Sequence, residues 1–85
     1  MRVLLIEDDE TIAALIRGGL EESRFSVDVA DEGDAGLRRA QAGGYDAILL
    51  DVMLPGRDGW SICRSLRAAT SGLRMSASPI RRGRM

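Results

Sequence analysis

Two short apolar runs that each end in acidic residues constrain the fold of this chain more than any other feature. The first run, residues 3–6, leads into four consecutive acids, and the second, residues 47–50, leads into Asp51. Unbroken apolar runs of this length are typical of strands that are buried on both faces of a parallel sheet. If the two strands are neighbours, Glu7, Asp8 and Asp51 converge at one edge of that sheet.

The segments between and after these runs predict alternating helices and strands. Apolar residues spaced three and four apart favour helices, the alternation around Val27 and Val29 favours a strand, and Asp9 is placed as a helix N-cap. Gly36 is expected to weaken the second helix by about 1 kcal/mol relative to Ala. The expected strands are residues 2–6, 26–30 and 47–50, and the expected helices are residues 10–22, 34–42 and 60–69.

This element order predicts an α/β fold with a parallel sheet. Crossovers between parallel strands are right-handed almost without exception, and ligands bind outside the carboxyl ends of the strands. Both acidic groups fall at those ends, so we expect a site for a cation and a phosphate there. A carboxylate can accept a phosphoryl group as a nucleophile, and Asp51, which stands alone at its strand end, is best placed for that role.

The crowding of acids calls for a compensating cation. Two carboxylates about 4 Å apart repel by about 4 kcal/mol at an effective dielectric constant of about 20. Hard oxygen donors favour Mg²⁺, whereas a zinc site would need Cys and His ligands, and the chain has one Cys and no His.

Length and composition indicate one small domain without a membrane span. The 85 residues contain neither a long apolar run nor the sections of a secretory signal, and the single Cys63 cannot form an internal disulfide. We therefore expect a cytoplasmic location. Residues 1–69 hold all 13 acids and 8 of the 12 arginines, whereas residues 70–85 hold 4 arginines, no acid and no clear periodicity. Residues 70–85 are expected to form a disordered basic tail.

Together these residues resemble the receiver domain of two-component response regulators, especially the subfamily that carries a winged-helix DNA-binding output domain. The resemblance covers residues 1–69. It lies in Val-Leu-Leu-Ile-Glu-Asp-Asp-Glu at residues 3–10, in Tyr45-Asp46, and in Leu50-Asp51-Val52-Met53-Leu54-Pro55 followed by Asp58-Gly59.

The resemblance implies a phosphoacceptor module rather than an enzyme. It implies that Asp51 takes phosphate from a sensor histidine kinase and that the side chains of Asp8 and Asp51 bind Mg²⁺. The backbone carbonyl of Met53 would add a ligand, and Glu7 would assist through water. DNA would be contacted only through an output domain that is absent from this chain.

The chain departs from the family pattern after residue 69. Family members continue with two more strands and two more helices, which supply a Ser or Thr and a Lys at the phosphoryl group. This chain has no Lys, and Arg is not an equivalent replacement. We therefore expect a truncated, partial flavodoxin-like fold with strand order 2-1-3 and three helices, lacking the fourth and fifth strands. Its third strand would be an exposed apolar edge that favours self-association.

Two other functions are compatible with the sequence. A remnant that is not phosphorylated would act as an interaction module through the third-strand edge and the first helix, and its association would not depend on Asp51. A metal-dependent phosphatase with an Asp nucleophile is the weaker alternative. By resemblance, such enzymes need a second acid two residues after the nucleophile, and Met53 occupies that position.

Overall fold

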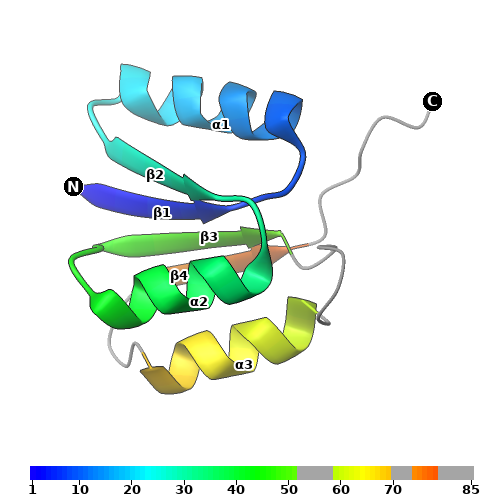
Figure 1. Cartoon of the computed structure of the whole chain (residues 1–85). Coiled ribbons are helices and arrows are strands. Elements are labelled where there is room, and N and C mark those ends of the chain that lie inside the picture. Colours follow the sequence, from blue (N-terminus) through cyan, green and yellow to red (C-terminus); the bar gives the residue numbers. More distant parts are fainter. Residues whose placement is uncertain (52–58, 70–73, 79–85) are drawn as a thin grey trace.

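A four-stranded parallel sheet separates one helix from two others (Figure 1). The computed structural model describes residues 1–51, 59–69 and 74–78. Helix α1 lies on one face of the sheet, and α2 and α3 lie on the other. The elements are β1 (Arg2–Ile6), α1 (Glu10–Glu22), β2 (Ser26–Ala30), α2 (Gly33–Ala42), β3 (Ala47–Asp51), α3 (Gly59–Ala69) and β4 (Arg74–Ser78).

The three strands and three helices expected from the sequence are confirmed, with bounds that differ by at most one residue. Helix α1 begins where predicted because the Oδ1 atom of Asp9 accepts a hydrogen bond from the backbone N–H of Ile12 at 2.9 Å. Helix α2 ends at Gly43, whose φ of 87° lies in the left-handed region that glycine tolerates. None of the helices in the described residues is long and apolar enough to cross a membrane.

Strand β4 corrects the expected topology. It pairs in parallel with β3 from Ala47↔Arg74 to Asp51↔Ser78, so the strand order is β2-β1-β3-β4. The predictions that the fourth strand is lacking, that β3 is an exposed edge and that residues 74–78 belong to a disordered tail are therefore wrong. The physical reason is that the outer edge of β3 carries N–H and C=O groups that a further strand satisfies. The remaining residues of the predicted tail, 70–73 and 79–85, lie outside the described residues.

The sheet buries side chains on both of its faces. Successive residues of a strand point to opposite faces, so β1 contributes Leu4 and Ile6 to one layer and Val3 and Leu5 to the other. The layer shared with α2 and α3 also contains Ala30, Ala40, Ile48, Leu50, Ile62, Cys63 and Leu66. The layer shared with α1 also contains Ala13 and Val27. Because β1 is buried on both faces, the carboxyl end of this strand is held in a fixed position.

Gly36 has a packing role that the sequence pattern does not reveal. This buried residue lies where α2 passes over β1, and a Cβ atom added to it would collide with the Cδ1 atom of Ile6 and lie 2.6 Å from its Cγ1 atom. The glycine that lowers helix propensity is therefore the residue that allows α2 to approach the sheet.

A polar network joins the amino end of β1, the middle of β2 and the residues before β3. The guanidinium of Arg2 lies 3.0 Å from Oδ2 of Asp28 and 4.7 Å from the ring centroid of Tyr45. The Tyr45 hydroxyl donates a 2.7 Å hydrogen bond to the same Asp28 oxygen. This bond and the neighbouring Arg2 keep the pKa of Asp28 below its ordinary 3.8, despite some desolvation. Desolvation, followed by the bond to Asp28, raises the pKa of the Tyr45 hydroxyl above its ordinary 10.0.

We expect a Tyr45→Phe variant to lose about 1 kcal/mol of unfolding free energy at neutral pH, because a hydrogen bond to a charged acceptor is lost at a partly exposed site. The folded-state pKa of Asp28 lies below its unfolded value, so its contribution is fully present above pH 3.8 and is lost as the pH falls through the lower folded-state value. The raised pKa of Tyr45 acts in the opposite sense, since its contribution is lost as the pH rises above 10.0 through the higher folded-state value.

Urea unfolding of the wild type and of the Tyr45→Phe variant, at pH values from below 3.8 to above 10.0, measures the difference between their free energies of unfolding. The difference between the two free energies of unfolding should disappear in acid, where protonated Asp28 no longer offers a charged acceptor. If the difference in free energy of unfolding stays unchanged in acid, the hydrogen bond from Tyr45 to Asp28 is not its cause.

Candidate metal centre

The register of the sheet brings two acidic segments together at its carboxyl edge. Strands β1 and β3 are neighbours, and Ile6 lies opposite Leu50. The next residue along each strand is an acid, Glu7 after Ile6 and Asp51 after Leu50. Asp8 follows on the turn that leads from β1 into α1. Residues more than forty positions apart in the sequence therefore share one edge.

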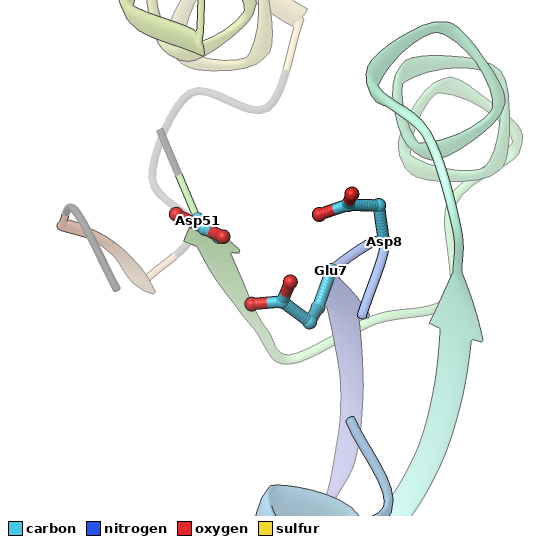
Figure 2. Close-up of side chains that lie close together, drawn as sticks. All are labelled: Glu7, Asp8 and Asp51. Atoms are coloured by element: carbon cyan, nitrogen blue, oxygen red, sulfur yellow. The ribbon is translucent and has the colours of Figure 1, made fainter. Parts of the chain in front are cut away.

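The carboxylates of Glu7, Asp8 and Asp51 point toward a common space, as Figure 2 shows. Each offers one oxygen atom, and these atoms all lie within 4.8 Å of one another. Glu7 is 1% exposed and Asp51 is fully buried, whereas Asp8 is half-buried. Two of the three acids thus lie in the protein interior and the third lies toward the solvent.

Local hydrogen bonds hold the β1 side of this cluster in place. The N–H of Glu7 donates to the carbonyl of Ala30 at 3.0 Å, which extends the pairing of β1 with β2 by one residue. The Oε1 atom of Glu7 accepts from the N–H of Asp9 at 3.0 Å, and Asp9 in turn caps α1. The turn is therefore tied both to the sheet and to the first turn of α1, so Glu7 and Asp8 have little freedom to separate.

The donor set fits a hard divalent cation. Carboxylates at this spacing repel one another by several kcal/mol, about 4 kcal/mol per pair at 4 Å and an effective dielectric constant of about 20. Mg²⁺ prefers oxygen ligands and is usually held by one or two carboxylates together with water and phosphate oxygens. The chain has no His, and its one Cys, Cys63, lies on α3 and is buried in the core, so a zinc-type donor set is not present.

Three of the four predicted metal-site residues are brought together. Within residues 1–51, 59–69 and 74–78, Glu7, Asp8 and Asp51 form the only group of three or more acid, His or Cys side chains whose ligand atoms lie this close. The fourth predicted residue, Met53, lies outside the described residues.

The class of protein to which this parallel α/β sheet with an acid cluster belongs is identified by a match to a known family. The family model for the response regulator receiver domain matches residues 3–77. The chain therefore belongs to the response regulator receiver domain family. The match extends through most of β4, beyond residue 69 where the sequence resemblance was expected to end.

Two curated relatives show the same relationship at the level of sequence. The transcriptional activator protein IrlR of Burkholderia pseudomallei is 45% identical over 71 residues, which cover 84% of this chain and 31% of IrlR. The transcriptional regulatory protein CusR of Escherichia coli is 44% identical over 73 residues, covering 86% of this chain and 32% of CusR. The chain thus spans about a third of the length of these relatives.

Solved structures confirm the fold. A crystal structure of the histidine kinase ThkA in complex with the response regulator protein TrrA, a protein of Thermotoga maritima, matches with a TM-score of 0.85 at 25% identity. That match covers 99% of this chain and 75% of the other. A response regulator from Burkholderia pseudomallei with a phosphorylated aspartic acid, a calcium ion and citrate matches with a TM-score of 0.83 at 27% identity, covering 91% of this chain and 46% of the other.

Proposed function

We propose that this chain is the phosphoacceptor module of a two-component phosphorelay and that Asp51 accepts a phosphoryl group from a sensor histidine kinase. The observation that carries this proposal is the convergence of Glu7, Asp8 and Asp51 within 4.8 Å at the carboxyl edge of a receiver-type sheet. Asp51 is the member of that cluster at the end of β3, facing the two acids at the end of β1.

The chemistry follows from the position of Asp51. One of its carboxylate oxygens attacks the phosphorus of a phosphohistidine, the phosphorus–nitrogen bond breaks, and the electron pair returns to the imidazole ring of the kinase. The product is an acyl phosphate on Asp51 and a free histidine on the partner. The phosphoryl group then stays on the chain, so the module acts as a stoichiometric switch rather than as a turnover enzyme.

Glu7, Asp8 and Asp51 are the residues that would hold Mg²⁺, Glu7 through a water molecule, and the backbone carbonyl of Met53 is proposed as a further ligand. When bound, the ion supplies positive charge that offsets the crowding of carboxylates and phosphoryl oxygens. The buried carboxylate of Asp51 is held by its strand, so its attacking oxygen keeps a fixed direction. Half-buried Asp8 lies toward the solvent, the side from which a phosphodonor can approach.

The comparisons support this assignment. The structural relative from Burkholderia pseudomallei contains a phosphorylated aspartic acid, and TrrA was crystallised in complex with a histidine kinase. IrlR and CusR are a transcriptional activator and a transcriptional regulator, and this chain spans only about a third of their length. We accordingly assign contact with DNA to an output domain outside these 85 residues, and a cytoplasmic location to the module.

The alternative function cannot use the edge of the third strand, because β3 is paired on both sides, with β1 and with β4. Any interaction through a sheet edge must use β2 or β4 in the described part of the chain.

The direct test is to incubate the purified chain with a small phosphodonor, such as acetyl phosphate, and to measure its intact mass. We expect the mass of one added phosphoryl group in the presence of Mg²⁺ and little addition when the metal is chelated. Circular dichroism on the same sample establishes that the chain is folded. A folded chain that remains unmodified with Mg²⁺ present would refute the proposed function.

A further inference from the structure

Asp9 uses three polar groups at the junction between the metal centre and α1. Its backbone N–H donates to Oε1 of Glu7 at 3.0 Å, and its Oδ1 atom accepts from the N–H of Ile12 at 2.9 Å. Its carbonyl accepts from the N–H of Ala13 at 2.9 Å. Asp9 is half-buried and is not a member of the three-acid cluster, and its carboxylate caps α1 instead. This fourth acid therefore has a different role from the three that would hold a cation.

The bond from Asp9 fixes the direction of the Glu7 carboxylate. Glu7 is buried, and its carboxylate faces those of Asp8 and Asp51 across a common space in Figure 2. Because like charges this close repel, repulsion favours rotation of the Glu7 side chain away from the other two. The N–H of Asp9 holds one oxygen of Glu7 and so keeps this side chain at the site before a cation arrives. Ligands that are oriented in advance bind a metal more tightly than ligands that must first be assembled.

The position of this N–H is set in turn by α1. The cap bond with Ile12 holds Asp9 at a φ of −84° and a ψ of 116°, the extended conformation that is typical of an N-cap. Helix α1 is itself packed on the sheet through Ala13 and Ile16. A continuous series of contacts therefore runs from the core through α1 and Asp9 to Glu7. The metal centre and the first turn of α1 share one residue.

We infer that Asp9 is a positioning residue for the metal centre, because its cap on α1 orients the N–H that holds Glu7. Occupancy of the metal centre and formation of the cap are then coupled. Such coupling is reciprocal, so a bound cation stabilises the cap by the same factor by which the cap raises the affinity for the cation. The inference rests on the metal site of the proposed function and adds to it a residue that is not a ligand.

Asp9 has a negative charge as well as a cap, and two substitutions separate these properties. A charge alone would attract a cation from any position at this edge of the sheet. Asparagine caps helices about as well as aspartate but is uncharged, whereas alanine does not cap. Asp9→Asn therefore removes the charge and keeps the positioning, and Asp9→Ala removes both.

Titration with MgCl₂, followed by the chemical shifts of the backbone amides, measures the dissociation constant for Mg²⁺ without any phosphodonor. We expect Asp9→Ala to raise this constant by about tenfold, as the loss of a group that orients a metal ligand does, and Asp9→Asn to remain close to the wild type. The matched control is Ala14→Gly, which weakens α1 at an exposed position without removing the cap and should leave the constant nearly unchanged. Equal affinity of Asp9→Ala and the wild type would overturn the inference, as would an equal loss in Asp9→Asn or in Ala14→Gly.

Hydrogen exchange in the wild type tests the coupling even if Asp9→Ala does not fold. The amide of Ile12 donates to Asp9, so saturation with Mg²⁺ should slow its exchange by about tenfold, the factor by which the cap raises the affinity. The control is the amide of Arg2, which donates to Oδ2 of Asp46 at the other end of β1 and should exchange at nearly the same rate with and without Mg²⁺. Unchanged exchange at Ile12, or equal slowing at Arg2, would overturn the inference.

The possible failures are distinguishable. A wild type that binds no Mg²⁺ would contradict the metal site itself and this inference with it. A wild type that binds Mg²⁺ but shows none of these effects would contradict only the role of Asp9. A wild type that shows all of them but takes up no phosphoryl group would contradict only the proposed phosphotransfer.

Discussion

An Asp51→Asn variant is expected to take up no phosphoryl group under conditions in which the wild type is modified. The amide of asparagine fills the same volume but offers no anionic oxygen to attack phosphorus, so no acyl phosphate forms. Asp51 is fully buried at the end of an interior strand, and a replacement of the same shape keeps the surrounding packing. Intact-mass measurement after incubation with phosphodonor and Mg²⁺ should therefore show complete loss rather than a reduced yield.

The control for this experiment is Asp31→Asn. Asp31 directly follows β2, so it also lies beyond the carboxyl end of a strand, but it is exposed and is not part of the three-acid cluster. We expect this variant to be modified as the wild type is. Continued phosphorylation of Asp51→Asn would show that another residue accepts the group. A parallel loss in Asp31→Asn would show that general acidity at this edge, and not the identity of Asp51, is responsible.

A Gly36→Ala substitution is expected to destabilise the fold even though alanine is the better helix former. The added methyl group would collide with Ile6, where α2 packs on β1. Overpacking a core in this way costs about 1–3 kcal/mol. The gain in helix propensity is about 1 kcal/mol, so we expect a net loss of up to about 2 kcal/mol of unfolding free energy by urea denaturation.

Gly18→Ala is the matched control, because a Cβ atom added at Gly18, in the interior of α1, meets no other atom within 4 Å. The same substitution there should stabilise the protein by about 1 kcal/mol through helix propensity alone. A loss of stability in Gly36→Ala and a gain in Gly18→Ala would distinguish the effect of packing from the effect of helix propensity. The cost of Gly36→Ala should also shrink when Ile6 is replaced by Val, since this removes the Cδ1 atom that the new methyl group meets. Equal effects of the two glycine substitutions would contradict the packing explanation.

Much of the secondary structure could be predicted because its causes are local. The apolar run of β1 and the N-cap at Asp9 are short-range signals, and both elements begin where those signals place them. The meeting of Glu7, Asp8 and Asp51 required one further assumption, that β1 and β3 are neighbours in a parallel sheet. The family resemblance of the motifs supplied that assumption, and the register confirms it.

Strand β4 was missed because its signal is weak within the segment itself. Met75 and Ala77 alternate with polar residues, which is a strand pattern, but only Met75 is a large apolar residue. Its pairing with β3 depends on hydrogen-bonding groups more than twenty residues earlier in the chain. Gly36 is a similar case. From the sequence it only lowers helix propensity, because the side chain that requires a glycine there, Ile6, belongs to β1.

The sequence by itself determined where the three helices and the strands β1, β2 and β3 lie and which acids follow the ends of β1 and β3, because periodicity, capping and chain order are properties of neighbouring residues. Only the tertiary structure decided which strand forms the edge of the sheet and how closely α2 approaches Ile6. Both features depend on backbone hydrogen bonds and side-chain contacts between residues far apart in the chain, whose relative positions are set only when the sheet forms.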